Sequence, residues 1–169
     1  MDPVRLQAAA GSLGVRLDDA QADRLIRYVA LLERWNARFN LISRKDIGRI
    51  WPRHILDSLS IGPLLAIESA SQQDETPQER TAIDIGTGAG LPGLPLAIAL
   101  PGLSWRLIDR NQRKVRFLET VISQIGLENA TVEAMDLGAV LASELLGVAD
   151  IVVSRAVNEP AGLLKLAAP

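Results

Sequence analysis

The chain has 169 residues, of which 48% are hydrophobic, so it can form one full-sized domain or a core with a small cap. The absence of cysteine and the single histidine, His54, exclude disulfides and cysteine nucleophiles and argue against a metal site. With a net charge of −2, any binding of nucleic acid would depend on local basic clusters. The first residues do not resemble a signal peptide, and no apolar run approaches the ~20 residues of a membrane span, so we expect a cytoplasmic protein.

The first predicted helix begins at Asp18, because Gln21 three residues later completes a capping box. Beyond it an apolar stripe at helical spacing favours packing into the core, formed by Leu25, Val29, Leu32, Trp35 and Phe39. We expect this helix to end at Asn40.

Residues 43–54 form a basic segment with two open interpretations. Its charges could hold RNA phosphates while Trp51 stacks on a base, or the segment could be a solvated helix face with a buried tryptophan. The RNA-binding candidates are Arg44, Lys45, Arg49, Arg53 and the adjacent His54.

His54 and Asp57 share a face of the next predicted helix, either as a structural hydrogen-bonded pair or as a catalytic pair. The polar stretch 68–80 then predicts an exposed linker. We therefore divide the chain into an N-terminal helical cap with linker, residues 1–75, and a core domain, residues 76–169.

A glycine-rich turn follows the apolar strand predicted at residues 82–85. Gly86, Gly88, Gly90 and Gly93 permit positive φ and close approach of a ligand, and Pro92 suits the first turn of a helix. We expect the backbone N–H groups of this turn to face a nucleotide-type cofactor.

The choice of cofactor depends on Asp84. Residues 88–93 fit the dinucleotide pattern G-x-G-x-x-G, and Asp109 lies at the spacing of a ribose ligand, which keeps an NAD-dependent dehydrogenase open. However, a carboxylate at Asp84 would repel a pyrophosphate. It would favour S-adenosylmethionine, which carries an ammonium and a sulfonium and no phosphate.

Strands and helices alternate after the turn. The strands are expected at 104–109, 129–134 and 150–154, and the helices at 112–125, 137–146 and from about Pro160. This pattern predicts a parallel sheet with helices on both faces and a ligand at the carboxyl ends of its strands. The polar residues at these ends are Asp84, Asp109, Asp136 and Ser154-Arg155.

Several segments resemble the glucose-inhibited division protein B family: DIGTGAGLPG at 84–93, LID at 107–109, IVVSRA at 151–156, WN through NLI at 35–42, and RHILDSL at 53–59. The resemblance implies a Rossmann-like α/β class I S-adenosylmethionine-dependent methyltransferase that modifies N7 of a guanine in small-subunit (16S) ribosomal RNA, either in the 30S subunit or free.

The same resemblance implies roles for individual residues. Gly86 and Leu91 would line the methionine end of the cofactor, and Asp109 would hold the ribose hydroxyls. Met135 and Asp136 would border the adenine, although Ala134 stands where a basic residue is expected. Arg155 would lie near the methyl group and the RNA.

Guanine N7 carries an exposed lone pair, so methylation needs no prior removal of a proton, and we expect alignment without a catalytic acid or base. Arg155 is the candidate for this role, as a donor to guanine or phosphate; the alternative is a salt bridge to Asp84 or Asp136. A second functional alternative is a non-catalytic ribosome-binding factor with the same fold.

Four strands are found where a sheet of this class would have about seven. We therefore expect a truncated sheet, with residues 151–153 at an edge that could associate with another copy. For the full-length protein we expect a monomer.

Overall fold

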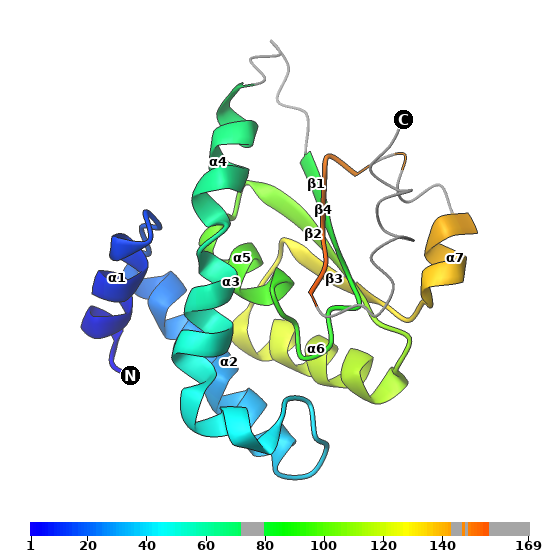
Figure 1. The fold of residues 1–169 in the computed structure, drawn as a ribbon, viewed down its shortest axis with the longest axis horizontal. Coiled ribbons are helices and arrows are strands. Elements are labelled where there is room, and N and C mark those ends of the chain that lie inside the picture. Colours follow the sequence, from blue (N-terminus) through cyan, green and yellow to red (C-terminus); the bar gives the residue numbers. More distant parts are fainter. Residues whose placement is uncertain (72–79, 143–146, 148, 156–169) are drawn as a thin grey trace.

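The computed structural model describes residues 1–71, 80–142, 147 and 149–155. Its centre is a parallel sheet of four strands in the order β3-β2-β1-β4, where β1 is Arg80–Ile85, β2 Leu103–Ile108, β3 Ala130–Glu133 and β4 Ile151–Val153 (Figure 1). The predicted parallel α/β sheet is confirmed. The chain moves outward from β1 to β3 and returns on the other side of β1, so its topological switch point lies between β1 and β4.

Helices cover both faces of the sheet, as predicted (Figure 1). On one face lie α5, Gly93–Ala99, and α6, Gln112–Ile125, and on the other α7, Leu137–Ala142. Successive side chains of β1 alternate between these faces: Ala82 joins the larger core cluster, whereas Ile83 and Ile85 pack with the Val140 side of the sheet.

Two helices occupy the N-terminal segment. Helix α1, Pro3–Ser12, was not predicted, although Asp2 caps it by accepting from the Arg5 N–H at 3.0 Å and Pro3 occupies its first turn. Helix α2, Asp19–Asn36, begins with the predicted capping box of Asp18.

The predicted end of α2 at Asn40 is wrong, because the helix ends at Asn36. The Asn36 side chain is buried, and its Oδ1 accepts a hydrogen bond from the Ile42 N–H at 2.9 Å, which turns the chain back towards the core. Phe39 therefore lies outside the helix and is 40% exposed, so the buried stripe stops at the partly buried Trp35.

Short helices connect α2 to the sheet. The first is the 3-10 helix η1, Arg44–Arg49; then come the π-helix η2, Trp51–Leu56, and the α-helices α3, Asp57–Leu59, and α4, Gly62–Ser71. The predicted linker is corrected at both ends, since residues 68–71 belong to α4 and Arg80 to β1. The rest of that linker, residues 143–146 of the third predicted helix and the helix expected near Pro160 lie outside the described residues.

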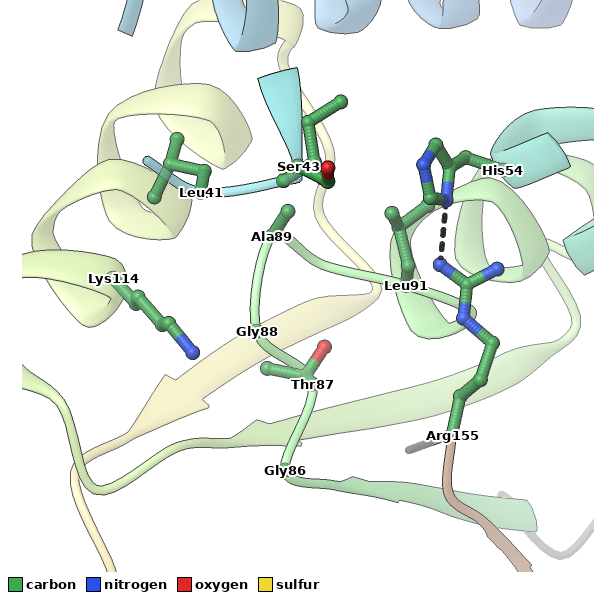
Figure 2. A pocket seen from close by; sticks show the side chains of 11 residues that line it. Leu41, Ser43, His54, Gly86, Thr87, Gly88, Ala89, Leu91, Lys114 and Arg155 are labelled. Carbon is green, nitrogen blue, oxygen red and sulfur yellow. Dashed lines mark hydrogen bonds between the residues drawn. The ribbon is translucent and has the colours of Figure 1, made fainter. Parts of the chain in front are cut away.

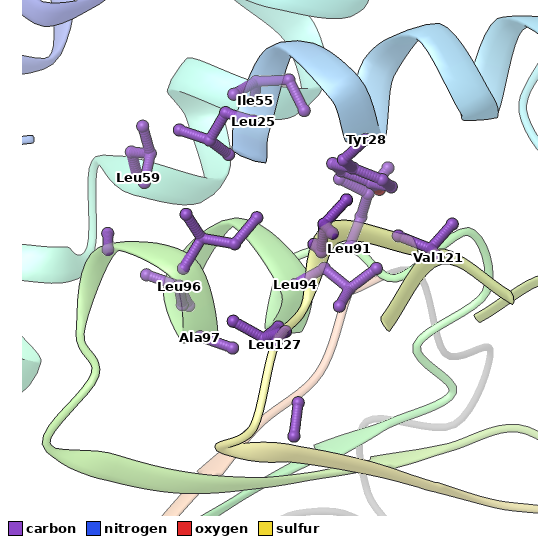
Figure 3. Packing of buried hydrophobic residues seen from close by; sticks show 14 of the residues in the cluster. Leu25, Tyr28, Ile55, Leu59, Leu91, Leu94, Leu96, Ala97, Val121 and Leu127 are labelled. Carbon is purple, nitrogen blue, oxygen red and sulfur yellow. The ribbon is translucent and has the colours of Figure 1, made fainter. Parts of the chain in front are cut away.

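One hydrophobic core joins the N-terminal helices to the sheet (Figure 3). Leu25 and Tyr28 of α2 and Ile55 of η2 belong to the same buried cluster as Leu94 of α5 and Val121 of α6. The core is thus continuous across the boundary expected near residue 75. In the described part of the chain, no helix combines the length and apolar character that crossing a membrane requires.

Candidate functional site

Three of the four glycines predicted to permit positive φ adopt it in the turn between β1 and α5, whereas Gly93 is the first residue of helix α5. Gly86, Gly88 and Gly90 have φ values of +71°, +63° and +94°, the left-handed region that favours glycine. Glycine here allows the backbone to fold tightly over the carboxyl end of β1.

The backbone N–H groups of this turn, however, do not face a ligand as expected. Those of Gly86 and Thr87 donate to the Ile108 carbonyl at 2.8 and 3.0 Å, and that of Gly88 donates to Asp109 Oδ2 at 3.0 Å. Those of Gly90 and Leu91 both donate to the Thr87 carbonyl, at 2.9 and 2.8 Å. Within residues 86–91, all of which are described, only the Ala89 N–H has no acceptor.

Asp84 lies beneath the turn and not on the wall of a ligand cavity. Its carboxyl group is fully buried, and Oδ2 accepts hydrogen bonds from Thr87 Oγ1 at 2.6 Å and from the Gly93 N–H at 2.8 Å. Oδ1 has no partner among the described residues. Burial raises the pKa of Asp84 to about 6, although both hydrogen bonds act in the opposite direction. The side chain expected beside the cofactor therefore holds the turn and the N-terminus of α5.

A cavity of about 260 Å³ opens above this turn, at the carboxyl ends of β1 and β4 (Figure 2). Its walls come from the loop after α2, from η2, from the turn, from α6 and from the end of β4. Five predicted residues line it: Gly86, Gly88, Leu91, His54 and Arg155. Six further lining residues were not predicted: Leu41, Ile42, Ser43, Thr87, Ala89 and Lys114.

Lys114 is the missed residue with the clearest sequence signal, since it lies in the first turn of the helix that follows the strand-end residue Asp109. Its Nζ is 3.4 Å from Asp109 Oδ2, which also accepts from the Gly88 N–H. Asp109 Oδ1 accepts from the Asn111 N–H at 2.8 Å. The carboxylate predicted to hold ribose hydroxyls thus lies directly behind the cavity wall, with protein donors as its partners.

Met135 and Asp136 do not line the cavity. Met135 packs against the cluster that contains Ile83 and Val140, and Asp136 Oδ1 accepts from the Ala139 N–H at 2.8 Å at the start of α7. Their predicted contact with an adenine stays a prediction.

Arg155 joins the end of β4 to the N-terminal half of the chain. Its Nη1 is 3.1 Å from Asp57 Oδ2, and its Nη2 is 2.9 Å from His54 Nδ1 (Figure 2). The alternative role predicted for Arg155 is a salt bridge to Asp84 or Asp136; in the structure its salt bridge is made to Asp57. His54 and Asp57, expected to pair with each other, both bind Arg155. Burial, reinforced by the positive charge of Arg155, lowers the pKa of His54.

Comparison with known proteins assigns the chain to a family. The family model described as GidB, rRNA small subunit methyltransferase G, matches residues 21–169. The chain belongs to this family. The resemblance found in the sequence is confirmed, and the family is one of methyltransferases of small-subunit rRNA.

Curated relatives agree with this assignment. The ribosomal RNA small subunit methyltransferase G of Stenotrophomonas maltophilia is 38% identical over 161 residues, covering 95% of this chain and 68% of the relative. That of Burkholderia thailandensis is 41% identical over 167 residues, covering 96% and 67%. The corresponding protein of Alkalilimnicola ehrlichii is 43% identical over 122 residues, covering 72% of this chain and 50% of the relative. The chain therefore spans between half and about two thirds of the length of these relatives.

The basic segment of this GidB-family chain stays on the surface. The side chains of Arg44, Lys45, Arg49 and Arg53 are all exposed. Arg49 and Arg53 each lie 3.5 Å from Asp46, whereas no described acidic group pairs with Arg44 or Lys45. Trp51 packs partly buried against the core, which favours the packing interpretation over base stacking. His54 differs from its neighbours because it faces the cavity. In the described residues, no cluster of acidic and histidine side chains could hold a metal ion.

Proposed function

We propose that this chain transfers a methyl group from S-adenosylmethionine to N7 of a guanine in small-subunit ribosomal RNA. One observation carries the choice of cofactor: most backbone N–H groups of the turn already donate hydrogen bonds to acceptors within the protein. A dinucleotide site presents such N–H groups and a helix N-terminus to a pyrophosphate. Here every N–H group of residues 86–91 except that of Ala89 is bonded within the protein, and the Asp84 carboxylate accepts from the Gly93 N–H at the N-terminus of α5.

The turn therefore offers little to a pyrophosphate, which weakens the dehydrogenase alternative. The reason differs from the one expected, because Asp84 takes the place of the phosphate instead of repelling it across an open pocket. The functional conclusion is the same: the site favours a ligand without phosphate.

The residues around the cavity fit S-adenosylmethionine. Leu41, Ile42 and Leu91 provide apolar contact, and Asp109, directly behind Gly88 and Lys114, offers a carboxylate for hydroxyl groups. When bound, this cofactor supplies the methyl group on a sulfonium. Because N7 of guanine already carries an in-plane lone pair, the protein's task is to align the base and exclude water. No side chain needs to act as a general base.

The exposed basic segment supports an RNA substrate. Arg44, Lys45, Arg49 and Arg53 lie on the stretch of chain between Ser43 and His54, which both line the cavity. Phosphate contacts from such side chains position an RNA without reading its sequence. We expect the substrate to be the 30S subunit or free 16S ribosomal RNA, encountered in the cytoplasm, and the full-length protein to act as a monomer.

Methyl transfer from isotopically labelled S-adenosylmethionine tests this function. The acceptors are 30S subunits, protein-free 16S ribosomal RNA and guanosine, and the product is identified by digestion and chromatography. We expect 7-methylguanosine from one or both RNA acceptors and none from guanosine. Binding of cofactor and RNA without transfer would instead make this chain a non-catalytic factor. Binding of NAD, with no binding of S-adenosylmethionine, would overturn the proposal.

A further inference from the structure

Arg155 uses only part of its hydrogen-bonding capacity within the described structure. A guanidinium carries five N–H groups. Its Nη1 donates to Asp57 Oδ2 at 3.1 Å and to the Arg53 carbonyl at 3.4 Å, and its Nη2 donates to His54 Nδ1 at 2.9 Å. The Nε–H and the second Nη2–H have no acceptor among the described residues.

These two donors lie on one edge of the guanidinium and form the fork that binds two oxygen atoms side by side. Arg155 lines the cavity, so this edge is available to a ligand there (Figure 2). The protein acceptors His54 and Asp57 occupy other donors of the same group and thereby fix its orientation.

The chemistry of the substrate decides which ligand the fork binds. Besides carboxylates and phosphates, an arginine fork commonly binds O6 and N7 of guanine. In an N7 methyltransferase, that contact would occupy the lone pair that must attack the methyl group. A carboxylate has two matching acceptors and no such conflict.

The charges around the cavity also favour a carboxylate. Its lining includes two cationic side chains, Lys114 and Arg155, and no Asp or Glu. Lys114 is already 3.4 Å from the Asp109 carboxylate, whereas the acid that pairs with Arg155, Asp57, is 58% exposed and therefore better screened by solvent. Arg155 is thus the cation better placed to bind an acidic group of the ligand.

We propose that His54 and Asp57 are positioning residues that hold Arg155 so that its free edge binds the carboxylate at the methionine end of the cofactor. The identity of this ligand rests on the proposed function.

Both ends of this arrangement are anchored. His54 and Asp57 lie on adjoining helical turns, and the buried Ser58 donates its hydroxyl to the His54 carbonyl at 2.6 Å. On the other side, Ser154 Oγ donates to the Ile85 carbonyl at 2.9 Å and ties the residue before Arg155 to the end of β1. These contacts explain how a long side chain can be held in one orientation.

The test compares two ligands that differ by one group. S-adenosylmethionine and its decarboxylated form share the adenosine, the sulfonium and the ammonium, and only the first has a carboxylate. Calorimetry without RNA measures both affinities for the unaltered chain, Arg155→Lys, Arg155→Gln, His54→Ala and His54→Asn. Arg106→Gln is the matched control, because the side chain of Arg106 is also 31% exposed and ion-paired, but with Glu133 away from the cavity.

We expect Arg155→Gln, Arg155→Lys and His54→Ala each to weaken binding of S-adenosylmethionine by about tenfold or more, with the decarboxylated ligand changing by less than about twofold. His54→Asn retains an acceptor near the position of Nδ1 and should restore most of the affinity. The Arg106→Gln control should bind both ligands like the unaltered chain.

The outcomes separate this inference from the proposed function. If the unaltered chain binds neither ligand, the proposed function fails. If it binds both, and the Arg155 variants weaken them equally, the carboxylate assignment is overturned. If His54→Ala and His54→Asn bind S-adenosylmethionine with the same affinity, His54 does not position Arg155. Thermal unfolding identifies any variant that does not fold, and Arg155→Lys then decides the carboxylate question.

Discussion

Asp84 shows how a buried charge can serve a functional turn without touching a ligand. Its Oδ2 binds Thr87 and Gly93, while its Oδ1 is buried with no partner in the described part of the chain. Removing a carboxylate from water is costly, and the pKa of about 6 reflects this cost. The residue therefore fixes the turn at the expense of stability at neutral pH.

Replacing Asp84 by Asn should remove this pH dependence. The pKa of Asp84 in the folded chain, about 6, lies above its usual value of 3.8, so the folded state binds this proton more tightly than the unfolded state. Its contribution to the free energy of unfolding is therefore full below pH 4 and is lost as the pH rises to 6. The free energy of unfolding of Asp84→Asn, measured relative to that of the unaltered chain, should therefore increase by about 2–3 kcal/mol from pH 4 to pH 7. Urea unfolding of both chains at pH 4 and pH 7 checks this. If the two chains differ in free energy of unfolding by the same amount at both pH values, the prediction is contradicted.

Gly93 should tolerate no side chain, because an added Cβ would lie 2.7 Å from Asp84 Oδ2 and would also overlap with Leu107. We expect Gly93→Ala to lower the free energy of unfolding by about 2–4 kcal/mol and to weaken cofactor binding. Gly102→Ala is the matched control, since a Cβ there meets no atom within 4 Å. Chemical denaturation compares the two, and similar losses would argue against the crowding.

At the scale of elements, α2 supports the turn from above. The buried Tyr28 hydroxyl donates to the Ala89 carbonyl at 2.8 Å, which links α2 to the middle of the turn. Gln21 of the same helix donates to the Ile98 carbonyl at 3.0 Å near the end of α5. Helix α2 therefore contacts both the glycine turn and α5, the helix that follows the turn.

Tyr28→Phe isolates the contribution of this hydroxyl, because phenylalanine fills nearly the same space. The Ala89 carbonyl, in a residue only 3% exposed, would lose its partner, so we expect a loss of about 1–2 kcal/mol in the free energy of unfolding. Affinity for S-adenosylmethionine should fall as well, since Ala89 lines the cavity. Denaturation and calorimetry measure the two effects; unchanged affinity would show that the turn keeps its shape without Tyr28.

The basic segment provides a prediction about RNA. Arg44 and Lys45 are the clearest candidates, because no described acidic group pairs with either, whereas Arg49 and Arg53 share Asp46. Changing Arg44 and Lys45 together to Gln should weaken binding of 16S ribosomal RNA and reduce the slope of log affinity against log salt by about 1.5. Changing the exposed Arg5 and Arg16 to Gln is the control for net charge. Equal salt slopes for the two double variants would remove this segment from the RNA interface.

At the scale of the whole molecule, the cavity exists only where distant parts of the chain meet. Its lining combines residues 41–43 and His54 with the turn, Lys114 and Arg155. The hydrophobic core likewise runs from α1 to α6 without interruption. The N-terminal helices therefore act as one wall of the site and as part of the core.

A fragment that starts at residue 80 should consequently not fold by itself. Without α2 and η2, the apolar surfaces of Leu94, Leu96 and Val121 would lose part of their buried partners. We expect circular dichroism of this fragment to show no cooperative thermal transition, in contrast to the intact chain. A sharp transition and retained cofactor binding would instead support the predicted division into two independent domains near residue 75.

The sequence by itself determined the features that depend on local patterns. The capping box at Asp18, the positive φ of Gly86, Gly88 and Gly90, and helix α6 over Gln112–Ile125 follow from neighbouring residues and were predicted correctly. The order of strands and helices, together with a few family segments, also sufficed for the fold class and the family. These features need no knowledge of which distant residues come into contact.

Only the tertiary structure decided what each strand-end residue contacts. Sequence position placed Asp84, Asp109, Asp136 and Arg155 at one edge of the sheet, but side chains alternate between faces and take whichever partner the packing brings near. Asp136 made a local cap with the Ala139 N–H, whereas Asp84 turned inward to Gly93 and Arg155 reached His54 and Asp57, about a hundred residues earlier in the chain. The contacts of Asp84 and Arg155 depend on how the turn and distant segments pack together, which no local pattern in the sequence encodes.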